Sequence, residues 1–331
     1  MNTDIQILRA LRQAGPEGVS GAALAKHLGV SRAAVWNRIE DLRRHGYQIE
    51  ASPHQGYLLR GTPDRLHPDD LLARLEGVRV VGRDVRVFEE TTSTNDVIEK
   101  LARDGVAEGM VVFAERQTRG RGRLGRRWES PAGLGLWFSV LLRPRLAPQA
   151  ASQLTVSSAV AVARAIERQT GLQPQIKWPN DIVFGTRKAA GILLELGADL
   201  DQIRHVVLGI GVDVNVLAGE FPGELREIAT SLREQAGEPI DRPALATAIL
   251  RELDHAYTRL RAGDFHELGD EWMRRCSTLG KNVSIRVGDR VVAGRAESLD
   301  EEGALLVRTE HGRLERMVGG DVTLLRGEAP P

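Results

Sequence analysis

Apolar residues recur at helical spacing through the first 45 positions, and a short alternating pattern follows them. Ile5, Leu8 and Leu11 form one apolar stripe. A later segment, SRAAVWNRIEDLRRHG, begins at Ser31, which can cap a helix, and it ends on a glycine. YQIEA and GYLLR then flank the loop SPHQ, as in a strand pair. The pattern predicts a winged helix-turn-helix domain over residues 1–62.

The helix that starts at Ser31 presents polar residues away from its apolar face, and these are candidates for contact with DNA. A recognition helix reads base edges from its N-terminal turns. Residues 1–60 carry eight Arg or Lys and five Asp or Glu, an excess of three positive charges that suits phosphate contacts. The alternative is a helical docking domain with a solvated polar face. The expected DNA-contacting residues are Ser31, Arg32, Ala33, Trp36, Asn37 and Arg38.

Residues 63–276 alternate between strand-like and helix-like patterns, which predicts a mixed α/β core in an α+β protein. The expected strands are 85–89, 110–115, 135–142, 175–184, 189–196 and 205–214. The expected long helices are 95–103, 150–170 and 243–261. Residues 277–326 change to short alternating runs with Gly and Asp at the turns, such as VSIRV and ALLVRT. This last pattern predicts a small SH3-like β-barrel as a C-terminal domain.

Composition excludes several classes of protein. The longest apolar run, residues 134–142, is far shorter than the roughly 18 residues that a membrane span needs. The N-terminus lacks the zones of a secretion signal, so we expect a cytoplasmic protein. Cys276 is the sole cysteine, and no Cys/His cluster has zinc-ligand spacing, so we expect no metal site built from protein ligands. The formal net charge is +0, so any polyanion must be bound by local patches.

The segment QTRGRGRLGRRW, residues 117–128, concentrates five arginines and three glycines in twelve positions. A dinucleotide fingerprint needs a strand that leads directly into the first glycine and a helix at the third, and neither flank fits. A nucleic-acid patch is unexpected between two buried strands. A phosphate-bearing small ligand fits better, because glycines let backbone amides approach an anion while Arg121, Arg123 and Arg126 supply forked donors. Trp128 offers a face on which a purine can stack.

Three further segments place polar groups where a site needs them. IKWPNDIVF sets Lys177, Asn180 and Asp181 beside an apolar run, where polar groups are costly unless they have partners. TTSTND places hydroxyls and an amide at a helix start, although Ser93 with Asp96 also fits a simple capping arrangement. GIGVDVN has two glycines that allow close backbone approach, or alternatively mark a β-bulge.

Lysine is rare in this chain, which draws attention to Lys188. Only five of the 45 basic residues are lysines, so a site that demands a compact ammonium would retain one against the compositional trend. Two apolar runs bracket residues 185–187, which predicts a hairpin that brings Asp181 and Lys188 close together.

Together these motifs resemble the biotin protein ligases of the bifunctional kind, which also act as repressors. The resemblance covers nearly the whole chain and rests on SRAAVWNRIEDLRRHGY, STN, QTRGRGRLGRRW, KWPNDIVF, RKAAGILLEL and GIGVDVN in the family's order. It implies that biotin and Mg-ATP react to biotinyl-5′-AMP, and that the biotin passes to a lysine of biotin carboxyl carrier protein. It also implies binding to a biotin-synthesis operator and a possible homodimer, with no membrane partner.

The resemblance also implies residue roles, position by position. The biotin-binding set is Ser93, Thr94, Asn95, Gln117, Gly120, Arg121, Gly122, Arg123 and Lys188. The ATP-binding set is Arg123, Arg126, Trp128, Asn180 and Asp213, and the catalytic set is Lys188, Arg123 and Arg126.

Two positions depart from the family pattern. Arg119 stands where a small residue is usual, and Asp213 stands where asparagine is usual. The first bears on how the loop begins, and the second on the nucleotide contact. Two alternative functions remain at this point: a lipoate-type protein ligase, and a biotin-sensing transcription factor without ligase activity.

Overall fold

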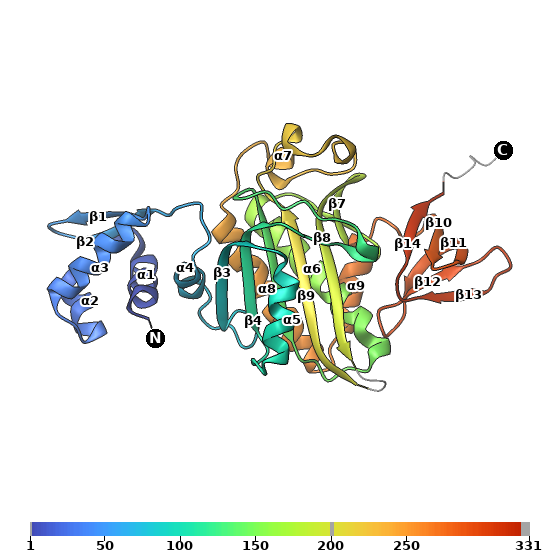
Figure 1. Ribbon diagram of the computed structural model, residues 1–331, viewed down its shortest axis with the longest axis horizontal. Helices are drawn as coiled ribbons and strands as arrows, with labels where there is room; N and C mark the ends of the chain where they lie inside the picture. Colours follow the sequence, from blue (N-terminus) through green and yellow to red (C-terminus); the bar gives the residue numbers. More distant parts are fainter. Residues whose placement is uncertain (1, 199–201, 326–331) are drawn as a thin grey trace. The chain divides into compact units, whose positions relative to one another are not determined.

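The computed structural model describes residues 2–198 and 202–325, and these fall into two compact units that divide between Gly77 and Val78. The first unit has the predicted helices and wing (Figure 1). Its elements are α1 (Thr3–Ala14), α2 (Gly21–Leu28), α3 (Arg32–Arg44), β1 (Gln48–Ser52), β2 (Gly56–Gly61) and α4 (Pro68–Arg74). Strands β1 and β2 pair antiparallel, and the apolar stripes of α1, α2 and α3 share one core. Helix α4 lies beyond the predicted boundary at residue 62, and its Asp70 pairs with Arg12 of α1.

The second unit is built around a seven-stranded mixed sheet with the strand order β3-β4-β5-β9-β8-β7-β6. Only the β3–β4 pair is parallel. The strands are β3 (Asp84–Thr91), β4 (Met110–Gln117), β5 (Gly135–Leu142), β6 (Gln175–Lys177), β7 (Asp181–Phe184), β8 (Arg187–Ala198) and β9 (Ile203–Asp213). The mixed α/β core predicted from the sequence is confirmed.

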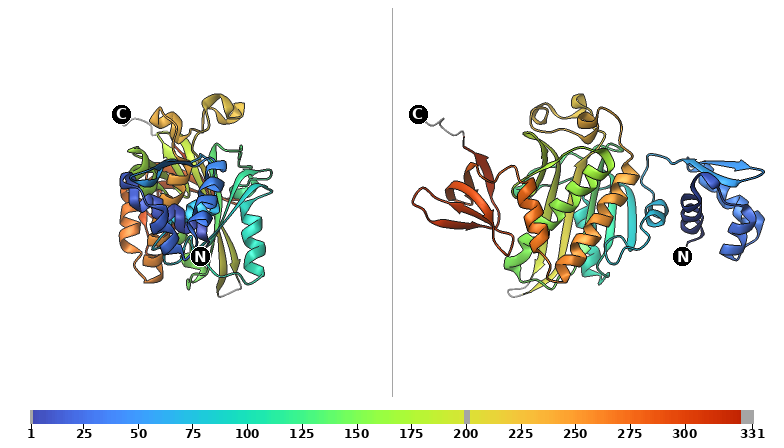
Figure 2. Two further views of the ribbon diagram at one scale, coloured as in Figure 1. Left: turned by 90° about the vertical axis from the view of Figure 1, so that its left-hand side faces the viewer. Right: turned by 180° about the vertical axis from the view of Figure 1, so that it is seen from behind.

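Helices cover both faces of this sheet (Figures 1 and 2). Helix α5 (Thr94–Arg103) packs on one face, against β4, β5 and β9. The opposite face is covered by α6 (Ala151–Thr170), α8 (Arg242–Arg261) and α9 (His266–Arg275), and α7 (Leu232–Ala236) is a short helix in the connection between β9 and α8. Strands β4 and β5 are buried over almost their whole length, as expected for the centre of a sheet that is covered on both sides.

One predicted strand is divided in the structure. The sequence pattern predicts a single strand over 175–184, but β6 and β7 are two short strands that pair antiparallel, with Lys177 opposite Asp181. Trp178, Pro179 and Asn180 form the turn between them, and the Trp178–Pro179 peptide bond is cis. Apolar periodicity continues through the turn because Trp178 is itself buried, so the pattern alone does not reveal the reversal.

The C-terminal part is β-rich, as predicted. Its strands are β10 (Asn282–Val287), β11 (Arg290–Leu299), β12 (Leu305–Arg308), β13 (Leu314–Met317) and β14 (Asp321–Leu324). They form one antiparallel sheet in the order β13-β12-β11-β10-β14. Among the described residues no pairing joins β13 to β14, so the strand pairing does not by itself close the predicted barrel. No helix in the described parts of the chain is both long and apolar enough to span a membrane.

Candidate active site

A pocket of about 450 Å³ opens on the α5 side of the sheet, where the predicted motifs converge. This volume lies in the range of small-ligand sites. The N-terminus of α5, the glycine-arginine loop (residues 117–128), the β6–β7 turn, and strands β8 and β9 contribute to its wall. All the residues expected to bind biotin or ATP, apart from Gly120, line this one pocket.

At one end of the pocket, the start of α5 is tied to the end of β4. Gln117 Oε1 accepts a hydrogen bond from the Thr94 backbone N–H at 2.8 Å, and Thr94 Oγ1 lies 3.2 Å from the same oxygen. Ser93 is buried, and its side chain makes no capping hydrogen bond to α5; Thr92, not Ser93, reaches Asp96. The capping interpretation of the Ser93 side chain is therefore wrong, and Ser93 is one of the residues that line the pocket.

The glycine-arginine loop folds as a tight hairpin above the sheet. Gly122 N–H donates to Arg126 O at 2.7 Å, and Trp128 N–H donates to Gly120 O at 3.0 Å. A Cβ atom at Gly120 would lie 2.4 Å from Trp128 O, so only glycine fits there. Arg119 is exposed, and its N–H donates to Thr92 O at 2.8 Å. The large side chain at this position therefore does not disturb the start of the loop.

Two glycines on β9 allow Asn95 and Trp128 to pack directly against the strand. Gly209, Gly211 and Asp213 are two residues apart, so they face the same side of the sheet. A Cβ atom at Gly209 would lie 2.3 Å from Asn95 Oδ1, and one at Gly211 would lie 2.6 Å from the Trp128 indole. The close approach that the sequence predicted is real, and the β9 pairing with β5 and β8 continues without a bulge at these glycines.

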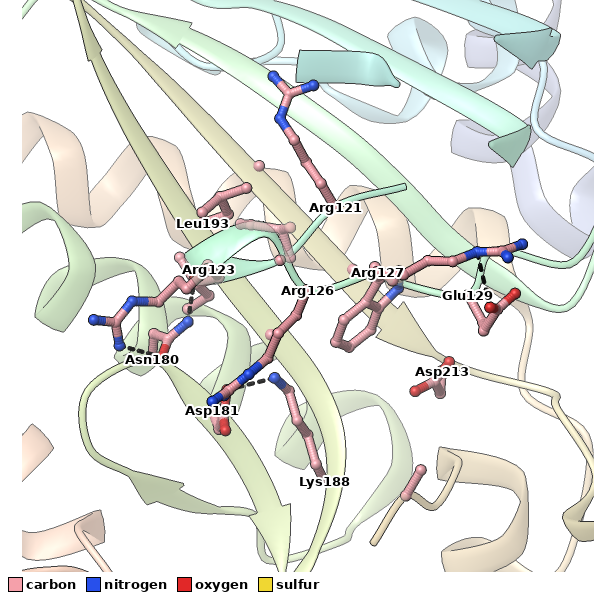
Figure 3. Close-up of a pocket in the computed structure, with 18 of the residues that line it drawn as sticks. Arg121, Arg123, Arg126, Arg127, Glu129, Asn180, Asp181, Lys188, Leu193 and Asp213 are labelled. Atoms are coloured by element: carbon pink, nitrogen blue, oxygen red, sulfur yellow. Dashed lines mark hydrogen bonds and ion pairs between the residues drawn. The ribbon is translucent and has the colours of Figure 1, made fainter. Parts of the chain in front are cut away.

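Lys188, Arg123 and Arg126 line the other end of the pocket (Figure 3). Lys188 Nζ lies 2.6 Å from Asp181 Oδ1, as the predicted hairpin requires, and 4.9 Å from the centre of the Trp128 ring. Arg123 Nη1 donates to Asn180 Oδ1 and to Gly320 O, each at 3.3 Å. Arg126 reaches Asp321 at 2.5 Å and points toward the Lys188 side of the pocket.

The three loop arginines differ in how their charges are balanced. Arg121 points away from Lys188 in Figure 3 and is paired with Asp96 and Glu195. Arg123 makes no ion pair within the described part of the chain, and burial lowers its pKa. Its hydrogen bonds reach only neutral oxygens, and the nearby charges of Asp181 and Asp321 offset the cost of burial only in part. Its surroundings therefore favour an anionic ligand beside Arg123.

Asp213, the second departure from the family pattern, ends β9 in the wall of the pocket. It is buried, and no hydrogen bond to its carboxyl group is found among the described residues. Burial raises the pKa of Asp213 well above its ordinary value, while the charge of Lys188 acts in the opposite direction. Asp213 therefore offers the pocket a carboxyl group whose charged form is disfavoured by burial.

In the first unit, the six predicted DNA-contacting residues are all exposed on α3 or at its start. Ser31 Oγ accepts a hydrogen bond from the Ala34 backbone N–H at 3.1 Å and so caps the helix as predicted. Trp36 is 55% exposed, so its ring is accessible on this face of α3.

Comparison with known proteins agrees with this site. The Biotin/lipoate A/B protein ligase family matches residues 87–213, an HTH domain matches 4–58, and the Biotin protein ligase C terminal domain matches 278–325. The chain is 38% identical to the bifunctional ligase/repressor BirA of Bacillus subtilis, over 96% of this chain and 97% of that protein. The chain belongs to the biotin protein ligase family.

Other members of the family show the same likeness over different lengths. BirA of Escherichia coli is 31% identical over 93% of this chain and 94% of its own length. A solved biotin protein ligase from Aquifex aeolicus, in complex with biotin and ATP, superposes with a TM-score of 0.64 at 31% identity, and covers 74% of this chain and 100% of that one. The helix-turn-helix match places this chain with the family members that carry the additional N-terminal domain.

The sequence analysis did not identify two polar residues of the site, Ser139 and Glu195. Ser139 is fully buried on β5, and its hydroxyl contacts Thr94 at 2.7 Å and Asn95 at 2.5 Å. Glu195 on β8 binds Asn95 and Arg121. The available signal was a lone polar residue within each apolar run, GLWFSVLL and AAGILLEL.

Proposed function

We propose that this chain joins biotin to ATP and then to a carrier protein. A carboxylate oxygen of biotin attacks the α-phosphorus of ATP, the bond to the β-phosphate breaks, and biotinyl-5′-AMP and pyrophosphate form. The ε-amine of a lysine on biotin carboxyl carrier protein then attacks the acyl carbon, AMP leaves, and the amine loses a proton. The observation that carries the proposal is Arg123, a partly buried guanidinium that forms no ion pair among the described residues, at the end of the pocket that holds Lys188.

We assign biotin to the end of the pocket near α5. Neutral donors and acceptors are concentrated there, which suits the uncharged ureido ring. The proposed contacts are Ser93, Thr94, Asn95 and Gln117, together with Gly120, Arg121, Gly122 and Arg123 from the loop and Lys188 at the carboxylate.

The nucleotide belongs to the end of the pocket near Lys188. A strand rises about 3.3 Å per residue, so the four steps from Gly209 to Asp213 on β9 span about 13 Å. This length is enough to separate the site for the biotin ring from the site for the adenine base. Arg123, Arg126, Trp128, Asn180 and Asp213 are the proposed ATP contacts. Among the described residues there is no cluster of three His, Cys, Asp or Glu side chains placed for a metal, so we propose that Mg²⁺ arrives with the phosphates of ATP.

The proposed chemistry explains why cations gather at this point. Bringing a carboxylate to a triphosphate places negative charges together, and the transition state adds charge at the α-phosphate. Fixed donors aimed at that charge lower the barrier, and removing one typically costs about 2.7–4 kcal/mol. Lys188 is already held 2.6 Å from Asp181, so it needs little reorganisation to act as one such donor. Arg123 and Arg126 supply the others.

Pyrophosphate exchange into ATP distinguishes the candidate activities. Exchange that depends on biotin supports the proposal. Exchange that depends on lipoate supports a lipoate-type ligase, and no exchange with either acid supports a sensor without ligase activity. Purified carrier domain then tests the second step, by the incorporation of labelled biotin.

We further propose that the first unit binds a biotin-synthesis operator, and that the adenylate promotes both DNA binding and pairing of two chains. The exposed face of α3, with Ser31, Arg32, Ala33, Trp36, Asn37 and Arg38, supports the DNA proposal. Gel shifts on the upstream region of biotin-synthesis genes, with and without biotin and ATP, test it. Sedimentation under the same conditions tests the dimer.

A further inference from the structure

Glu195 lies on the pocket face of β8, beyond the residues assigned to either substrate. Gly191 and Leu193 line the pocket, and Glu195 follows at the same two-residue spacing, so its side chain emerges on their side of the sheet. Both of its carboxylate oxygens are engaged by groups from two other elements, namely the glycine-arginine loop and α5.

The loop side of this arrangement is a forked ion pair. Arg121 Nε and Nη2 donate to the two oxygens of Glu195, each at 3.0 Å, while Nη1 donates to Asp96 Oδ1 at 2.5 Å. The hydrogen bonds to Glu195 also raise the pKa of Arg121. Isolated surface pairs contribute little, but a forked arginine-carboxylate pair fixes geometry as well as charge.

The α5 side is a chain of short hydrogen bonds that runs into the core. Asn95 Nδ2 donates to Glu195 Oε2 at 2.5 Å, and Ser139 Oγ donates to Asn95 Oδ1 at 2.5 Å. Thr94 Oγ1 donates to Ser139 Oγ at 2.7 Å, and the Thr94 backbone N–H donates to Gln117 Oε1 at the base of the loop at 2.8 Å. Because Asn95 is buried, the orientation of its amide is fixed by these partners.

We propose that Glu195 is a positioning residue, which holds Arg121 of the loop and Asn95 of α5 in one clasp that keeps the loop closed over the substrate end of the pocket. In this arrangement Arg121 holds the loop closed, while Arg123 and Arg126 bind the phosphate of the nucleotide. The inference rests on the proposed function, because that function places biotin beneath this part of the loop.

Substitution of Glu195 tests the clasp in the full-length protein. Glu195→Gln keeps the size of the side chain and an acceptor for Asn95, but it removes the charge that Arg121 needs. We expect the KM for biotin in pyrophosphate exchange to rise about five- to tenfold, with kcat within about twofold. We also expect trypsin to cut within residues 119–127 of the substrate-free protein faster by a similar factor.

Glu90→Gln is the matched control. Glu90 lies on β3 and forms an ion pair with Arg116 at 2.8 Å. Arg116 directly precedes Gln117, but the side chains of Glu90 and Arg116 are both more than half exposed. This variant should keep the wild-type KM and the wild-type rate of loop cleavage. Glu195→Asp retains the charge, so it should lie between the wild type and Glu195→Gln.

Two outcomes overturn the proposal. One is a Glu195→Gln protein with wild-type KM and wild-type loop cleavage. The other is a parallel fall of kcat and melting temperature with unchanged KM, which indicates a purely structural role. If Glu195→Gln does not fold, Arg121→Lys, which keeps the charge but loses the fork, gives the same test. Loop cleavage needs no ligase activity, so failure of the wild type to exchange pyrophosphate refutes the proposed function and still leaves the clasp testable.

Discussion

Replacing Lys188 with alanine removes the compact cation that we assign to the α-phosphate. The ammonium lies 2.6 Å from Asp181 and 4.9 Å from the centre of the Trp128 ring, and 32% of the side chain is exposed. Loss of one fixed donor to transition-state charge costs about 2.7–4 kcal/mol, which corresponds to a fall of about 10²–10³ in kcat. We therefore expect Lys188→Ala to reduce biotin-dependent pyrophosphate exchange by that factor, with an unchanged circular dichroism spectrum.

Lys188→Arg tests whether a compact charge is required. A planar guanidinium spreads its charge over a larger group and presents its donors in a fixed fork, so it cannot reproduce the compact point charge of the ammonium. We expect the arginine variant to lose at least tenfold in exchange. Lys100→Ala, on the exposed side of α5, is the control and should keep wild-type exchange. Near-normal exchange by Lys188→Ala would refute the reasoning.

Three further predictions follow from the glycines of β9, the buried acid of the pocket and the recognition helix. Gly211→Ala places a Cβ atom 2.6 Å from the Trp128 indole, so we expect pyrophosphate exchange to fall at least tenfold. In the control Gly219→Ala the new Cβ atom meets nothing within 4 Å, so exchange should not change. Equal activities of the two variants would contradict the close packing of Trp128 on Gly211. The pKa of Asp213 is raised by burial, so the wild type loses stability as pH rises from 3.8 through the folded-state pKa. The melting temperature of Asp213→Asn, measured relative to wild type, should therefore increase across that interval, and a constant difference would contradict the prediction. Arg32→Ala should weaken operator binding and lower the salt dependence of log K by about one unit, while Arg313→Ala, in the turn between β12 and β13, should do neither. An unchanged salt slope for Arg32→Ala would exclude a phosphate contact.

Features that depend on nearby residues could be predicted from the sequence. The hairpin that joins Asp181 to Lys188 required only two apolar runs and a turn at residues 185–187, and the structure confirms it. The helix-turn-helix could also be predicted from nearby residues, because the cap and the apolar stripe of each helix lie within a few residues of one another. The chain reversal at Trp178 was missed because a buried tryptophan continues the apolar pattern of a strand.

Contacts between distant segments could not be read from periodicity. Arg126 reaches Asp321 and Arg123 reaches Gly320, each across nearly 200 residues, and no local pattern encodes these pairs. The position of Glu195 could have been predicted, because alternate residues of a strand face the same side and Glu195 is four residues after Gly191. Its partners Arg121 and Asn95 belong to other elements, so its role required the three-dimensional arrangement.

The central claim is that the Lys188 ammonium and the Arg123 guanidinium both contact the oxygens of one phosphate group, the α-phosphate. A crystal structure with a non-hydrolysable analogue of biotinyl-5′-AMP tests it most directly. We predict that Lys188 Nζ and Arg123 both lie within hydrogen-bonding distance, about 3.2 Å, of the phosphate oxygens. A phosphate bound elsewhere, with Lys188 still paired to Asp181 alone and Arg123 still bound only to Asn180 and Gly320, would contradict the account.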